Sequence, residues 1–212
     1  DEAEEDGQYG SISSRYTKAL ARSMSATKEI KAANILNNAT SGSYTGGDSV
    51  SLLNTAHTTR VGSQSNTLAT AADLSETSLE SILINIADMK DERGLRVAAQ
   101  GTMLIIPTAY SFTAERLLES QLRTGTADND VNAIRSGGYL SQGYHVMRRL
   151  SDSDAWYVKT DVPDGLKMFQ RTAMKKGMEG DFETGNIRYK VRERYSFGWT
   201  DWRGIFGSEG AS

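Results

Sequence analysis

The clearest alternation of apolar and polar positions lies over residues 187–200. Its odd positions are mostly apolar or aromatic, and its even positions include Arg188, Lys190, Arg192 and Arg194. Such alternation predicts a strand with one apolar face and one cationic face. At ~3.3 Å per residue the strand would reach roughly 46 Å, although strands usually have about 5–6 residues. We interpret it as part of an extended body that meets neighbouring molecules, in which Glu193, set among the apolar positions, marks a bulge or a polar contact.

A helical pattern occupies residues 12–38. Apolar or small side chains recur every three or four positions and form one narrow stripe: Ile12, Tyr16, Leu20, Met24, Thr27, Ile30 and Ala33. Asn37, Asn38 and Gly42 predict the end of the helix. A helix of this length, about 40 Å at ~1.5 Å per residue, is also longer than a small globular domain requires.

Residues 40–67 are rich in Gly, Ser, Thr and Asn and contain few apolar anchors. We expect a long loop that is ordered mainly by contact with a neighbouring molecule, because so little apolar burial cannot offset ~1–2 kcal/mol of backbone entropy per residue.

Shorter elements are predicted between residues 68 and 172. Asp73 and Glu76 suggest a capping box, with Ser75 as a competing cap, before a helix that ends by Arg93-Gly94. The remaining predicted elements are a buried strand over 103–106, a helix from Phe112, a short helix and turn over 128–138, a hairpin of 145–150 with 155–160, and a strand over 166–171. Helices set among strands in this way predict an α+β fold.

Composition narrows the function classes. The 212 residues have a mean hydropathy of -0.49 and no cysteine, which excludes disulfides, thiol catalysis and cysteine-ligated metals. No apolar run approaches the ~20 residues of a membrane span. The net charge of -3 argues against nucleic-acid binding by bulk charge. Five of the first six residues are acidic, and this acidic run is either a solvated terminus or a contact with a basic neighbour.

Candidate catalytic residues are scarce. His57 and His145 lack a partner at metal-ligand spacing, so we expect a solvated loop residue and a half-buried strand residue, respectively. Ser25 and Lys28 match a Ser-x-x-Lys pattern, but the companion motifs of acyl-transfer enzymes are missing. The sequence therefore predicts no enzyme, no cofactor and no metal site.

The basic residues Arg188, Lys190, Arg192 and Arg194 allow three interpretations. They could pair with carboxylates of a neighbouring subunit, follow the phosphates of a nucleic acid, or form a solvated face. We favour subunit contacts, because the aromatic residues lie on the opposite face and give no mixed platform for stacking bases.

Several motifs stand in order along the chain: Thr27–Ile30 with Ala32–Asn37, Leu68–Ser75, Ile86–Asp88, Asp91–Gly94, Gly125–Asp130, Glu179–Asn186 with Arg188–Trp199, and Arg203–Ser208. Together they resemble the tailed-phage major capsid protein family. The chain departs from the family pattern at Thr58 and Thr108, where prolines are expected. These two differences concern loop geometry.

The resemblance implies a Hong-Kong-97-type capsid fold of the α+β class. Its peripheral domain would comprise residues 1–67 and 173–212, with spine helix 12–38 and long strand 187–200 packed together, and its axial domain residues 68–172. The N-terminal arm and extended loop of the family would be absent from this chain.

The implied function is that of a structural major capsid protein, which assembles through pentamers and hexamers into an icosahedral phage head around double-stranded DNA. The expected partners are further copies of the chain, scaffold, portal or decoration proteins, and packaged DNA on the inner face without sequence-specific reading; no membrane is expected. The expected location is the virion, after assembly in the host cytoplasm. The alternative is a nucleic-acid-binding module that uses the basic strand 188–194.

Overall fold

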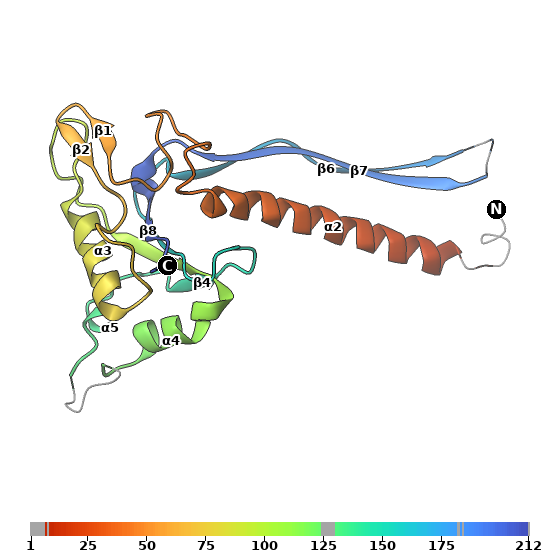
Figure 1. The fold of residues 1–212 in the computed structure, drawn as a ribbon. Helices are drawn as coiled ribbons and strands as arrows, with labels where there is room; N and C mark the ends of the chain where they lie inside the picture. Colours follow the sequence, from red (N-terminus) through yellow and green to blue (C-terminus); the bar gives the residue numbers. More distant parts are fainter. Residues whose placement is uncertain (1–6, 8, 124–129, 182, 184, 212) are drawn as a thin grey trace. The chain divides into compact units, whose positions relative to one another are not determined.

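The computed structural model describes residues 7, 9–123, 130–181, 183 and 185–211. These residues form two compact units (Figure 1). Unit 1 comprises Asp1–Ala32 and Met168–Phe197, and unit 2 comprises Ala33–Lys167 and Gly198–Ser212. The acidic run and most of Gly125–Asp130 lie outside the described residues. The assignment of peripheral and axial domains stays a prediction.

Unit 1 consists of most of helix α2 (Tyr9–Asn37) and of a two-stranded sheet, β6 (Leu166–Gly180) with β7 (Ile187–Trp199). The helix runs alongside the hairpin (Figure 1). The predicted long helix and long strand are both confirmed, with ends that shift by at most three residues. The strand predicted over 166–171 is much longer, since its apolar, basic and small residues continue to Gly180.

Unit 2 is built on a four-stranded sheet in the order β4-β3-β5-β8. The strands are β3 (Gly101–Ile106), β4 (Tyr144–Val146), β5 (Trp156–Thr160) and β8 (Ile205–Ser208). The predicted hairpin of 145–150 with 155–160 is wrong. Both strands pair with β3 from opposite sides, β4 in parallel and β5 antiparallel, because the continuous apolar run of β3 forms the buried centre of the sheet.

Helix α3 (Glu76–Asp88) packs its apolar stripe on this sheet, so that Leu79, Ile82 and Ile86 join one core cluster with Leu104 and Trp156. Its N-cap is not the predicted Asp73–Glu76 box. The Ser75 and Ser78 side chains each accept the other residue's backbone N–H, at 3.2 and 2.9 Å.

The remaining helices are short. They are η1 (Thr108–Tyr110), α4 (Ser111–Glu119), α5 (Ala133–Ser136) and η2 (Trp202–Gly204). The helix predicted to reach Arg93-Gly94 ends earlier, at Asp88, and Gly94 at φ +86° forms a turn instead.

Residues 40–67 are not a structureless loop. They contain the antiparallel pair β1 (His57–Thr59) and β2 (Gly62–Gln64). Leu52 and Leu53 are buried in a second core cluster with Ile205. Leu52 and Leu53 anchor part of the segment within unit 2, while Val61 keeps 57% exposure. The expectation that a neighbouring molecule orders the rest stays a prediction.

Candidate functional site

The four basic residues predicted as contacts occupy alternate positions of β7. Arg188, Lys190, Arg192 and Arg194 are all exposed, whereas Tyr189, Val191, Glu193, Tyr195 and Phe197 between and after them are partly buried. The alternation predicted from sequence is therefore confirmed, while the role of the basic residues as contacts stays a prediction.

Strand β6 adds two exposed cations to the same side of the sheet, since its third odd-position cation, Lys167, is partly buried and pairs with Asp164. A Cβ built on Gly177 would lie 3.1 Å from the Lys190 Cε. Side chains at odd positions of β6 therefore project from the same side of the sheet as those at even positions of β7. Arg171 and Lys175 are odd positions of β6 and are exposed. We call the six residues the cationic face: Arg171, Lys175, Arg188, Lys190, Arg192 and Arg194.

The sequence interpretation missed this half of the site. It ended the strand at Arg171, because the even positions of β6 mix methionine with glutamine and lysine and show no clean alternation. Arg171 and Lys175 are four residues apart, so in a strand their side chains lie on one face. This spacing indicates a basic face only once the strand is known to continue to Gly180.

The cationic face is neutralised unevenly. Near the hairpin turn, Arg188 pairs with Asp181 at 2.8 Å and Lys190 with Glu179 at 3.7 Å. These pairs are largely exposed and contribute about 0–1 kcal/mol each. Within the described part of the chain, Arg171, Lys175, Arg192 and Arg194 form no ion pair. Four positive charges are thus left available to an outside partner.

The opposite face of the hairpin lies against α2. Glu193 is buried there, and its carboxylate accepts a hydrogen bond from Lys28 Nζ at 2.6 Å and from the Gln170 amide at 3.3 Å. Lys28 also lies 5.3 Å from the centroid of the Tyr195 ring. The polar contact predicted for Glu193 is confirmed, and it fixes which face of the hairpin points away from the helix.

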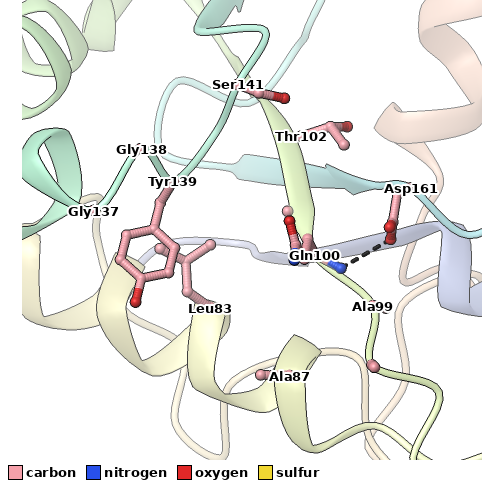
Figure 2. A pocket seen from close by; sticks show the side chains of 12 residues that line it. Leu83, Ala87, Ala99, Gln100, Thr102, Gly137, Gly138, Tyr139, Ser141 and Asp161 are labelled. Atoms are coloured by element: carbon pink, nitrogen blue, oxygen red, sulfur yellow. Dashed lines mark hydrogen bonds between the residues drawn. The ribbon is translucent and has the colours of Figure 1, made fainter.

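Unit 2 contains a hollow of about 630 Å³ between α3 and the start of β3 (Figure 2). Leu83 and Tyr139 stand on one side of it, and the Asp161 carboxylate accepts the Gln100 N–H at 2.8 Å on another. The described lining includes the hydroxyls of Thr102 and Ser141 beside the Asp161 carboxylate, but the Thr102 hydroxyl donates to the Lys159 carbonyl at 3.0 Å and the carboxylate is engaged by the Gln100 N–H.

Ser25 and Lys28 lie one turn apart on α2. Lys28 is engaged with Glu193, which removes it as a base for Ser25. His57 is buried and not solvated, and His145 is exposed and not half-buried, so both predicted environments are wrong. No group of three His, Cys, Asp or Glu side chains within the described ranges could hold a metal ion. In the same ranges, no helix is long and apolar enough to cross a membrane.

Comparison with known proteins identifies the chain. The sequence model of the family described as phage capsid protein matches residues 1–207. The chain belongs to this family. Its role is therefore structural, as a virion component, and the sequence resemblance is confirmed at that level. The comparison with curated proteins gave no match.

Two solved structures are similar to this capsid-family chain. One, from Mycobacterium phage Che8, has a TM-score of 0.49 at 15% identity and is matched over 91% of this chain and 61% of its own. The other is a virus-like particle from Pyrococcus furiosus, with a TM-score of 0.42 at 12% identity over 67% of this chain and 55% of its own. The chain thus spans less than two thirds of either structure.

Proposed function

We propose that the chain is the repeated shell subunit of a tailed-phage head, with the Hong-Kong-97-type layout of spine helix, peripheral domain and axial domain. Copies would form pentamers and hexamers, and these would tile an icosahedral shell around double-stranded DNA. Membership of the phage capsid protein family is the single observation that carries this proposal. Scaffold, portal and decoration proteins are the further partners, assembly takes place in the host cytoplasm, and no cofactor or turnover is involved.

The cationic face is the proposed contact between copies. A face of cations on one subunit and carboxylates on the next make a heterologous contact, which closes into a ring when the rotation allows it. Arginine suits this role, since its guanidinium binds carboxylates through two parallel hydrogen bonds. Arg192 and Arg194 have no carboxylate partner in the described part of their own chain, so a neighbour can supply one.

The acidic run is the proposed source of those carboxylates, because residues 1–6 hold five acidic side chains. The Lys28–Glu193 pair places Arg192 and Arg194 beside residue 28 of the continuous helix α2. Residue 9 is about 28 Å away along the helix at 1.5 Å per residue. Residues 1–8 reach at most roughly 26–29 Å when fully extended, and the cationic face lies beyond the hairpin. The acidic run of the same copy would have to be fully extended for even its first residue to reach Arg192 or Arg194, so a neighbouring copy is the proposed source.

Charge reversal tests this proposal. Arg192→Glu should abolish shells before any DNA is packaged, as measured by light scattering and electron microscopy of native assemblies. Combining Arg192→Glu with Glu4→Lys and Glu5→Lys should restore part of the assembly. The matched control is Arg96→Gln, because Arg96 lies outside the cationic face and is paired with Asp88 at the surface of unit 2, so its loss should leave assembly intact. A chain that stays monomeric under every assembly condition would exclude a shell subunit.

The alternative function is nucleic-acid binding through the same face. Its support is that the cations extend over two strands, so that Arg171 and Lys175 widen the basic strip. Phosphate contacts would make DNA affinity fall steeply with salt. Normal empty shells from Arg192→Glu that fail only to retain DNA would favour this alternative over subunit pairing.

A further inference from the structure

The hollow between α3 and the start of β3 combines an apolar wall with a carboxylate. Leu83 and Ala87 of α3 and the ring of Tyr139 line one side, and Asp161 lies on the other (Figure 2). Tyr139 keeps 56% exposure, so its ring is open to a partner. The volume of about 630 Å³ lies within the ~300–1,000 Å³ typical of small-molecule pockets, so one long side chain can enter it.

The Asp161 carboxylate has room for a cationic partner. Among the described lining residues it alone is charged. Its Oδ1 accepts the Gln100 N–H at 2.8 Å, which uses one of the roughly four lone-pair sites of a carboxylate. Asp161 is exposed and forms no ion pair with another residue that the structure describes. A cation from outside can therefore bind it without displacing a contact of the fold.

The backbone around the hollow is held in an unusual conformation. Ala98 lines the hollow at φ +54°, and Leu140, next to Tyr139, has φ +60°. Residues other than glycine rarely adopt positive φ, and those held there gather at functional sites. Gly137 lets the Tyr139 ring lie close to the backbone, because a Cβ at this position would collide with the ring. The fold thus keeps the hollow open in spite of local strain.

We propose that the hollow receives an arginine side chain of a second copy of the chain, and that this side chain is Arg171. The proposal rests on the proposed shell function and names a second contact between copies. A guanidinium binds a carboxylate through two parallel hydrogen bonds and stacks on an aromatic ring such as that of Tyr139. The methylene stem of the arginine would cover Leu83 and Ala87, as long basic side chains do on apolar surfaces.

Arg171 meets the requirements of this contact. It is exposed on β6 and forms no ion pair within the described ranges of the chain. The proposed contact with the acidic run uses Arg192 and Arg194, and Arg188 pairs with Asp181, which leaves Arg171 as the arginine of the cationic face without an assigned partner. Since one copy carries both the arginine and the hollow, each copy can bind the next, as in a heterologous ring interface.

A small probe tests the chemistry of the hollow without any assembly. N-acetyl-arginine methylamide is titrated into the unassembled, nitrogen-15-labelled chain of 212 residues. We expect saturable NMR shifts of the Gln100 N–H, which is bonded to Asp161. The citrulline analogue has the same stem without the charge and should leave this signal in place. Asp161→Asn should remove the response while keeping an acceptor for the Gln100 N–H.

A double-mutant cycle tests the occupant. Arg171→Gln and Asp161→Asn should each raise the subunit concentration at which shells form by about tenfold, and together by about tenfold rather than about a hundredfold, because both remove the same contact. Light scattering measures this concentration. Lys175→Gln is the matched control, since Lys175 is exposed on the same face of β6 and its effect should multiply with that of Asp161→Asn.

An unmoved Gln100 N–H, or effects of Arg171→Gln and Asp161→Asn that multiply, would overturn the proposal. Equal coupling of Lys175→Gln to Asp161→Asn would overturn it as well, since it would show attraction between charges without a specific contact. A wild type that forms no shells would count against the proposed function instead, and the arginine titration would still decide whether the hollow binds a guanidinium.

Discussion

Removing Lys28 should cost more than removing its partner Glu193. The Glu193 side chain is 2% exposed and the Lys28 side chain 30% exposed. Lys28→Met leaves a buried carboxylate with only the Gln170 amide near it. Breaking a buried pair from one side costs about 3–5 kcal/mol, and the partial exposure of Lys28 reduces this to about 2–3 kcal/mol. Glu193→Gln leaves a lysine that can turn to water, so about 1 kcal/mol is expected.

Hydrogen exchange measures this difference within unit 1. A loss of about 2.7 kcal/mol raises the exchange of β7 amides by roughly 100-fold. Replacing both residues, in Lys28→Met with Glu193→Met, should be less harmful than Lys28→Met alone, since no charge is left buried. Lys190→Met is the control, because its pair with Glu179 is 76% and 77% exposed and should change stability by no more than about 0.5 kcal/mol. The reasoning is refuted if Lys28→Met proves as mild as Glu193→Gln.

Three further predictions concern unit 2. Gly165→Ala would place a Cβ 2.8 Å from the Gly204 Cα and should lower the free energy of unfolding by about 1–3 kcal/mol, whereas Gly47→Ala meets no atom within 4 Å and should leave the urea midpoint nearly unchanged. Ser75→Ala removes the N-cap of α3 and should cost about 1 kcal/mol in the same assay; no loss would assign the cap to another residue. Burial raises the pKa of the Tyr157 hydroxyl above its ordinary value, so stability should hold up to about pH 10 and fall above it, where the unfolded chain ionises first. Tyr157→Phe should reduce this alkaline loss in urea titrations, and an unchanged slope would contradict it.

Periodic patterns in the sequence predicted the long elements well. The sequences of α2 and β7 repeat their apolar positions over many turns or alternations, because each element has one face against a partner and one face in water. The polar contact at Glu193 was predictable for the same reason, since an acidic residue in an apolar row has to find a donor.

The pairing of short strands could not be predicted. β4 and β5 are close in sequence, which suggested a hairpin. In the sheet, however, β3 lies between them. His57 was misplaced because its neighbours are polar, and its burial depends on Trp202, which follows it by more than a hundred residues. The second half of the cationic face was missed because β6 shows little alternation of its own.

The antiparallel pairing of β8 with β5 has a consequence for the biosynthesis of the chain. The sheet of unit 2 stays incomplete until residues 205–208 have been translated, and the whole β6–β7 hairpin leaves the ribosome before them. The nascent chain must therefore hold β5 with an open edge while the hairpin is made. The entropic cost of bringing β8 to β5 rises only weakly with the number of residues between them, by about 0.6 kcal/mol for each doubling. The hairpin can therefore lengthen or shorten during phage evolution with little thermodynamic effect on the sheet that encloses it in sequence.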